Sequence, residues 1–427
     1  MKTRFDRVLE TAALPAASLR VRCVRCAAEP AEDAIFEGCH QCRREGFRAN
    51  YELAEDQHGT FTVPDQDERA GGIWRWRENL PPLPGNCEIT LGEGNTPLLA
   101  LERAGGRIYL KDESQNPTWS HKDRLCAVAA SHAASTGARV TVVSSSGNHA
   151  LSAAAYAARA GLPCVVITHE GMPAPVRSAV TAYGAHLVIV PGERRWDLVE
   201  RSVHELGWYP FSNFTAPATG NPIALEGYKT IAFELAEQLG WKAPTSVIVP
   251  TGYAEALCGI WRGFKEMHAA GTIATLPKMI SVEPAVSAPL HNSIAQQLHD
   301  PAPVHGGKSL ASSINVKVTS VHALMTIEES QGHALAVSET DILTGHHELA
   351  GHGFYVENAS ATSYAGLLHA EANGLDLGED PVLISTSTGI KDATSRQNTP
   401  PSTLDGTWQT FLDTLPDELL LRPAYNQ

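Results

Sequence analysis

Beyond about residue 85, short apolar runs alternate with longer alanine-rich segments, which is the pattern of strands followed by helices. Strands are predicted at 139–144, 162–168, 186–190, 246–250, 278–283 and 381–384, and helices at 150–159, 175–183 and 256–268. Apolar runs of this length suit strands buried on both faces, so parallel sheets covered by helices are expected. The predicted fold class is therefore α/β. The loop-rich stretch 210–222 separates two groups of units and predicts two domains with a cleft between them.

Residues 1–80 lack this alternation and carry two cysteine pairs, Cys23-x-x-Cys26 and Cys39-x-x-Cys42, separated by twelve residues. Four thiolates in two such pairs suit a tetrahedral zinc ion with no open position, so a structural role is expected. Four unliganded thiols are the alternative; a redox pair is less favoured because the two pairs match each other. The other cysteines are expected to be buried small apolar residues: Cys87, Cys126, Cys164 and Cys258.

Composition narrows the classes of partner. The 427 residues are 43% hydrophobic and 19% charged, as in an ordinary globular protein, and allow two or three domains. The formal net charge of −14 argues against nucleic acid or an anionic membrane as the main partner. The first residues show neither a signal peptide nor a membrane span, so a cytoplasmic location is expected.

Segment 111–124 reads as a short strand, a polar turn and then Lys122 at the mouth of a helix. The positive potential of a helix N-terminus disfavours a charged amine, and a neutral amine is what Schiff-base chemistry needs. Taken alone, the segment is equally consistent with a surface lysine after a turn.

Three further segments place polar residues where a predicted strand meets a helix or loop. In 144–149, hydroxyls and free amides at a helix N-terminus suit a carboxylate, although a plain helix cap has the same pattern. Segment 249–257 is again strand, loop and helix, which suits a phosphate bound by backbone N–H groups. Segment 385–392 is a polar loop after the last strand, and alone it indicates little.

In this order and spacing, the segments resemble the fold-type II pyridoxal phosphate enzymes, the superfamily of threonine synthase and tryptophan synthase β. The resemblance spans roughly residues 90–395. The N-terminal region with its two cysteine pairs resembles a zinc ribbon, which points to the threonine synthase branch. It also covers three further segments: 91–98, 225–230 and 356–361. The domains implied are an N-terminal zinc-ribbon-like extension (1–80), a large cofactor-binding domain (81–120 plus 225–410), a small mobile domain (121–224) and a tail (411–427). A homodimer is also implied.

The resemblance implies a role for each matching residue. Lys122 would hold pyridoxal 5'-phosphate as a Schiff base, and Asn148 would contact its phenolic oxygen. Thr386 would meet the pyridine nitrogen, where a neutral hydroxyl disfavours transamination relative to elimination or replacement. The cofactor phosphate would be bound by the loop of Thr251, Gly252, Tyr253, Ala254, Glu255 and Ala256. The amino-acid substrate would be bound by Ser145, Ser146, Gly147, Asn148, His149 and His121.

The chain departs from threonine synthases at several of these positions. Ala224 stands where an arginine is expected to clamp the substrate phosphate, so a phosphorylated substrate should bind poorly unless another cation substitutes. Glu255 replaces a glycine of the phosphate loop, and we expect its carboxylate to point away from the phosphate; an altered loop is the alternative. Tyr253, His149 and His121 also replace usual residues.

The predicted function is pyridoxal-phosphate-dependent elimination or replacement at the β or γ carbon of an amino acid, with Lys122 removing the α-proton. His149 and His121 are candidates for protonating the leaving group, although a packing role is the simpler interpretation. Three alternatives stay open: threonine synthase acting on O-phosphohomoserine, a β-replacing synthase like the cysteate and cysteine synthases, and a catalytically silent interaction protein that keeps the fold.

Overall fold

The computed structural model describes most of the chain. The described residues are 19–31, 34–54, 60–64, 66–84, 87–103, 106–211, 221–392 and 407–413. They fall into two units, residues 1–395 and residues 396–427, and the second contains a short helix, α12 (Trp408–Asp413). The rest of the predicted tail and most of the predicted loop 210–222 lie outside the described residues.

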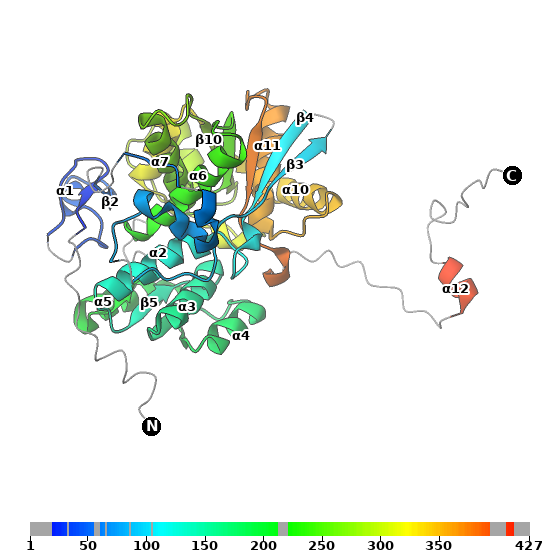
Figure 1. Ribbon diagram of the computed structural model, residues 1–427. Helices are drawn as coiled ribbons and strands as arrows, with labels where there is room; N and C mark the ends of the chain where they lie inside the picture. The colour runs from blue at the N-terminus through cyan, green and yellow to red at the C-terminus, as the bar shows by residue number, and fades with distance from the viewer. Residues whose placement is uncertain are drawn as a thin grey trace. The chain divides into compact units, whose positions relative to one another are not determined.

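The larger of two α/β sheets has six strands in the order β11-β10-β9-β12-β4-β3. Neighbouring strands are parallel except that β3 runs antiparallel to β4 at the edge. The strands are β3 (Leu98–Arg103), β4 (Gly106–Asp112), β9 (Ser246–Pro250), β10 (Lys278–Pro284), β11 (His333–Val337) and β12 (Pro381–Ser385). Strands β9 and β12 are buried along their whole length, because helices cover both faces of the sheet. Figure 1 shows the antiparallel pair β3 and β4 beside helices α10 and α11.

The helices of this part of the chain are α6 (Lys229–Gln238), α7 (Glu255–Ala269), α8 (Pro289–Ala295), α9 (Val321–Glu329), α10 (Glu339–Gly351) and α11 (Asn358–Ala372). Helix α11 packs against four strands of the sheet, and α7 packs against α6 and α9. The 310 turns are η3 (Gln66–Asn79), η4 (Glu113–Gln115), η5 (Gly192–Arg194), η6 (Ala224–Tyr228), η7 (Ser312–Ile314) and η8 (Gly389–Lys391).

The smaller sheet has four parallel strands in the order β7-β6-β5-β8. Its strands are β5 (Thr141–Ser144), β6 (Cys164–Thr168), β7 (His186–Ile189) and β8 (Tyr209–Pro210). Its helices are α2 (Lys122–Ser135), α3 (Asn148–Ala160), α4 (Ala174–Ala182) and α5 (Arg195–Leu206). Helices α3 and α5 pack against β5, and α2 packs against α3 (Figure 1). All these elements lie within 121–224, the segment predicted to form a small domain; whether that segment moves as a unit stays a prediction.

Helix α2 is enclosed on nearly all sides, because α3 and η6 both pack directly onto it. The contact requires glycine at position 227: a Cβ atom there would lie 2.1 Å from the backbone oxygen of Arg124. This close approach brings Tyr228 next to the first turn of α2, where Lys122 lies.

The N-terminal region forms a small ribbon of strand β1 (Val21–Cys23), helix α1 (His40–Arg44) and strand β2 (Tyr51–Leu53). Strands β1 and β2 pair antiparallel. The ribbon is fixed to α7 by Arg262, which donates to the Glu52 carboxylate at 3.0 Å and to the backbone oxygen of Leu53 at 2.6 Å. It therefore contacts the helix whose first turn, at Glu255, lines the pocket described below.

The predicted α/β class is confirmed, and the predicted strands and helices agree with the observed ones to within one or two residues. Cys126, Cys164 and Cys258 are buried as expected. Cys87 is only partly buried, so the expectation is wrong for that residue, which lies in an irregular segment before β3. Among the residues that the structure describes, no helix combines the length and apolar character that a membrane span requires.

Candidate active site

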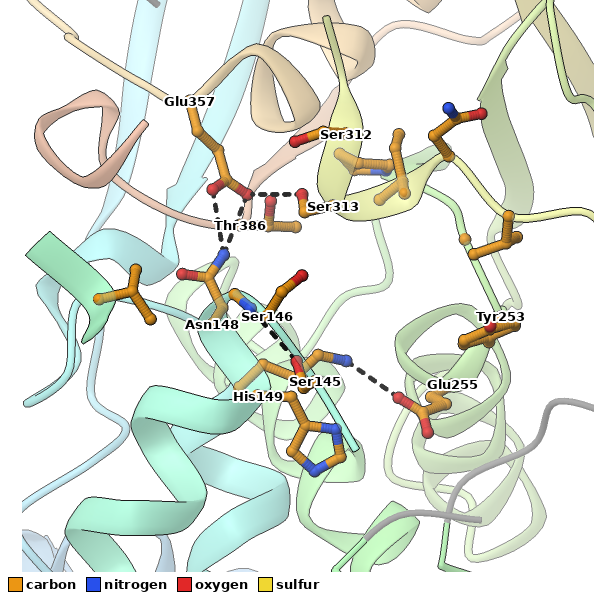
Figure 2. Close-up of a pocket in the computed structure, with 18 of the residues that line it drawn as sticks. Ser145, Ser146, Asn148, His149, Tyr253, Glu255, Ser312, Ser313, Glu357 and Thr386 are labelled. Carbon is orange, nitrogen blue, oxygen red and sulfur yellow. Dashed lines mark hydrogen bonds and ion pairs between the residues drawn. The ribbon is translucent and has the colours of Figure 1, made fainter. Parts of the chain in front are cut away.

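A cavity of about 440 Å³ lies where helices α2, α3 and α7 begin. Its walls come from the loops after β5 and β9, the stretch 312–316, and residues near the end of β12. Figure 2 shows Ser145, Ser146 and His149 on one side, with Tyr253 and Glu255 facing them. All but one of the predicted cofactor-binding and substrate-binding residues line this cavity. The fold therefore brings together segments that are far apart in the sequence.

Lys122 is the first residue of α2, and its side chain is 18% exposed. Its Nζ donates to the Glu255 carboxylate at 2.9 Å and to the Tyr228 hydroxyl at 3.0 Å. Burial lowers the pKa of Lys122, but the charge of Glu255 and the contact with Tyr228 outweigh burial and raise the pKa above its ordinary value. The expected downward shift of this pKa is therefore wrong, because the contacts with Glu255 and Tyr228 together outweigh burial.

Glu255 lines the cavity, and its carboxylate pairs with Lys122. Burial is the largest single effect and raises the pKa of Glu255, but the charge of Lys122, the charge of His149 and the hydrogen bond from Lys122 together outweigh it, so the net shift is downward. Two favourable interactions hold the carboxylate there, the ion pair and the positive end of α7, whose first residue it is. Whether this carboxylate also faces away from a bound phosphate stays a prediction.

The rest of this loop turns sharply into α7. Ala254 adopts a left-handed backbone conformation, with φ of 66°, immediately before α7. Gly252 packs against Ile314, whose Cα would lie 3.2 Å from an added Cβ atom. Thr251 does not line the cavity: its hydroxyl donates to the backbone oxygen of Val249 at 2.8 Å. The hydroxyl of Thr251 is thus used within the loop, and the predicted part of Thr251 in the cofactor-binding loop stays a prediction.

The serine-rich loop, residues 144–147, lines the opposite wall of the cavity, and α3 begins directly after it at Asn148. The Asn148 amide nitrogen donates to both carboxylate oxygens of Glu357, at 3.0 and 3.1 Å (Figure 2). Its amide oxygen accepts from Lys391 Nζ at 2.6 Å and from Ser387 Oγ at 3.2 Å. These partners fix the amide plane of Asn148 in the cavity wall.

Two buried polar atoms of this wall have no hydrogen-bond partner among the described residues, Ser144 Oγ and His149 Nε2. Burial lowers the pKa of His149 to about 4, so its ring is neutral near neutral pH. A buried polar atom without a partner is costly, so both atoms are available to a polar ligand.

Thr386 and His121 lie side by side in the cavity. The backbone N–H of His121 donates to the backbone oxygen of Thr386 at 3.0 Å, and the His121 ring stacks on Tyr228 with centroids 5.5 Å apart. Burial holds the pKa of His121 well below its ordinary value. The Thr386 hydroxyl shares a hydrogen bond of 2.8 Å with Ser360 Oγ.

A buried network of charges holds the start of α2 in place. Arg124 donates to Glu113 and to Glu234, each at 2.7 Å, and Lys111 donates to Glu234 at 2.7 Å. All four side chains are at most 1% exposed, so every charge is paired inside the protein. The network joins β4, η4, α2 and α6, and it fixes the backbone that carries Lys122.

The sequence alone did not reveal several residues of the site. Tyr228, Glu357 and Lys391 lie in segments that carried the resemblance, but nothing in the sequence paired them with Lys122 or Asn148. Burial lowers the pKa of Lys391 to about 8 and raises that of Glu357. Arg195 gave no signal, because it lies in an ordinary amphipathic helix.

The cysteine cluster has the geometry of a metal site. The four Sγ atoms of Cys23, Cys26, Cys39 and Cys42 lie within 4.8 Å of one another. The pairs Cys23–Cys42 and Cys26–Cys39 are each 3.6 Å apart. Tetrahedral Zn–S bonds of about 2.3 Å would place sulfur atoms about 3.8 Å apart, so the cluster is close to the required size.

The cavity suits pyridoxal phosphate in most respects. It provides a lysine amine, two helix N-termini, two unpartnered polar atoms and sufficient volume. The exception is Glu255, whose carboxylate repels a phosphate at the start of α7. The residues therefore fit the cofactor with one unfavourable charge.

Comparisons with known proteins agree with this geometry. The family model described as pyridoxal-phosphate dependent enzyme matches residues 89–387. Threonine synthase of Methanocaldococcus jannaschii is 35% identical over 87% of this chain and 92% of its own length. Threonine synthase of Mycobacterium leprae is 34% identical over 78% of this chain and 91% of its own length. The solved serine racemase of maize has a TM-score of 0.61 at 18% identity, covering 74% of this chain and 92% of its own, which shows a shared fold.

Proposed function

Because this chain belongs to the pyridoxal-phosphate-dependent enzymes, within the threonine synthase family, we propose that it eliminates or replaces a group on the β or γ carbon of an amino acid. The observation that carries the proposal is the position of Lys122 Nζ, which lines the cavity between the serine-rich loop and the start of α7. Lys122 would hold the cofactor, with Asn148 and Thr386 beside its ring.

Bound pyridoxal phosphate supplies an electron sink that stabilises the carbanion left when an α-proton is removed. The protein's own groups handle the proton. Lys122 Nζ is the base, and Glu255 and Tyr228 stabilise the ammonium that it becomes. The α3 terminus, with Ser145 and Ser146, orients the substrate carboxylate.

His149 has a more limited role than a general acid. Since its pKa is lowered to about 4, its neutral ring carries no extra proton to donate near neutral pH. We propose that Nε2 orients the substrate's leaving group or side chain by a hydrogen bond. His121 stacks on Tyr228 and acts as a positioning residue for Lys122.

Threonine synthase activity is the second candidate, favoured by the names of the similar curated proteins. The position expected to clamp a substrate phosphate is Ala224, which is completely buried and does not line the cavity. A phosphorylated substrate therefore needs a cation from elsewhere in the cavity.

A panel of amino acids tests the proposed function. The cofactor-loaded protein is incubated with serine, threonine, O-phosphoserine and O-phosphohomoserine, and the products are identified by mass spectrometry. We expect a keto acid with ammonia, or a replacement product, from at least one of them. Threonine formed from O-phosphohomoserine would establish the second candidate. A loaded protein that converts none of them would support the silent alternative.

Glu255 gives a prediction about cofactor capture. In Glu255→Gln, burial of Lys122 is no longer opposed by a carboxylate, so its pKa falls and more of the amine is neutral at pH 7. Each unit by which this pKa falls raises the neutral fraction about tenfold. We expect covalent capture of pyridoxal phosphate at pH 7 to be about tenfold faster or more.

The measurement is the capture rate, followed by visible absorbance, as a function of pH. The rate of the unchanged protein should rise with pH across the neutral range, and the rise should occur at lower pH in the variant. Glu205→Gln, an exposed acid on α5 paired with Arg201, is the matched control. Identical pH profiles for the protein and Glu255→Gln would contradict the proposed effect of this ion pair.

We also propose that Cys23, Cys26, Cys39 and Cys42 bind a structural zinc ion. The support is the clustering of the four sulfur atoms and the small apolar content of the ribbon that they join. A cytoplasmic homodimer with a mobile small domain, as the sequence implies, stays a prediction.

A further inference from the structure

The cationic side chains of the cavity differ in how their donors are used. Three lysine or arginine side chains line it among the described residues: Lys122, Arg195 and Lys391. Lys122 is paired with Glu255. Lys391 Nζ donates to the backbone oxygens of Thr118 and Trp119 and to Asn148. Both amines therefore already donate hydrogen bonds to groups of the protein.

Arg195 is the exception. It is the first residue of α5, and its Nε donates to the backbone oxygen of Gly192 at 3.0 Å. Within the described part of the chain, no carboxylate forms an ion pair with its guanidinium. Arg195 is half-buried, and this burial lowers its pKa. A guanidinium has five N–H donors, so the remaining ones can meet a ligand.

The surroundings of Arg195 place this cation near the loop that follows β9. The next residue, Trp196, contacts the Tyr253 ring edge-on, with centroids 6.4 Å apart. His169 lines the same part of the cavity, and its pKa is lowered by burial and by the charge of Arg195.

We propose that Arg195 binds the phosphate monoester of a ligand in this cavity. The inference rests on the proposed function and deepens it, since it names the charged group that the ligand carries. A dianion near α7 is opposed by Glu255, and a guanidinium offsets that repulsion while matching the geometry of a phosphate. Arg195 thus supplies the cation that Ala224 lacks. Two ligands have this chemistry, the cofactor's own phosphate and a phosphorylated amino acid.

The test compares each phosphorylated ligand with its unphosphorylated counterpart in Arg195→Gln. One arm measures binding of pyridoxal 5'-phosphate and of pyridoxal by visible absorbance. The other measures, on the loaded protein, the spectral change on adding O-phospho-L-serine or L-serine. We expect affinity for at least one phosphorylated ligand to fall about tenfold or more, and that for its counterpart to change by less than about twofold. Arg195→Lys should retain part of the affinity.

Arg194→Gln is the matched control, because Arg194 is an exposed neighbour whose side chain pairs with Asp197 at the surface. If affinity falls for pyridoxal 5'-phosphate but not for pyridoxal, Arg195 binds the cofactor phosphate. If affinity falls for O-phospho-L-serine but not for L-serine, Arg195 binds the substrate phosphate. Equal losses for both members of each pair, or no loss in either arm, would overturn the proposal. Failure of the proposed function is a separate outcome, in which the loaded protein converts no amino acid. The comparison of pyridoxal 5'-phosphate with pyridoxal would still test whether Arg195 binds a phosphate.

Discussion

Lys122→Ala should abolish turnover and the visible absorbance of the bound cofactor. In the proposed function the same amine holds the aldehyde and removes the α-proton, so its loss removes both functions at once. Loss of the general base alone is expected to slow the reaction by about 10²- to 10⁴-fold, and loss of covalent attachment adds to this. The measurement is the absorbance spectrum after addition of pyridoxal phosphate, followed by product formation with the best substrate of the panel.

Lys265→Ala is the matched control for this experiment, because Lys265 is an exposed lysine on α7 that pairs with Glu329 outside the cavity. It should keep both absorbance and turnover. Since Lys122 and Glu255 form a partly buried pair, the removal of Lys122 leaves a carboxylate without its cation, and the thermal midpoint of Lys122→Ala should be measured alongside. A folded Lys122→Ala protein that retains turnover would exclude Lys122 as the base.

Removal of the metal should unfold the N-terminal ribbon. The ribbon has two three-residue strands and a five-residue helix, too little structure to be stable alone. We expect one zinc ion per chain by elemental analysis. In Cys39→Ser we expect no bound zinc, a loss of about 3 kcal/mol or more in the stability of the ribbon, and rapid proteolysis within residues 20–54.

Cys87→Ser is the control for zinc binding, since Cys87 lies outside the cluster, and it should keep the ion. Loss of the ribbon should also make the position of Glu255 in the site less fixed. Arg262 lies on α7, the helix that begins at Glu255, and it would lose its contacts with Glu52 and Leu53 of the ribbon. A protein purified without metal and equally resistant to protease before and after chelation would contradict the zinc proposal.

The sequence predicted the framework well because that part depends on local pattern. The bounds of β9 (Ser246–Pro250) were predicted to the residue, since a short apolar run between polar residues is a strong local signal. Lys122 and Asn148 follow strands and polar turns, but their roles were inferred from the family resemblance, because the local pattern alone also fits a surface lysine and a plain helix cap.

Contacts between distant segments could not be predicted in the same way. The pairing of Lys122 with Glu255 joins residues 133 positions apart, and it reversed the expected shift in the lysine pKa. Glu357 is likewise 209 positions from Asn148, whose amide it fixes. Arg195 lies in a helix whose sequence shows only amphipathic spacing, so its place in the cavity became apparent only from the fold.

Mapping of the covalently bound cofactor tests the central claim most directly. The protein is loaded with pyridoxal phosphate, reduced with borohydride, digested and analysed by mass spectrometry. The account predicts one modified peptide, which carries the reduced cofactor on Lys122. A modification on any other lysine, or a loaded protein whose Lys122 peptide stays unmodified after reduction, would contradict it.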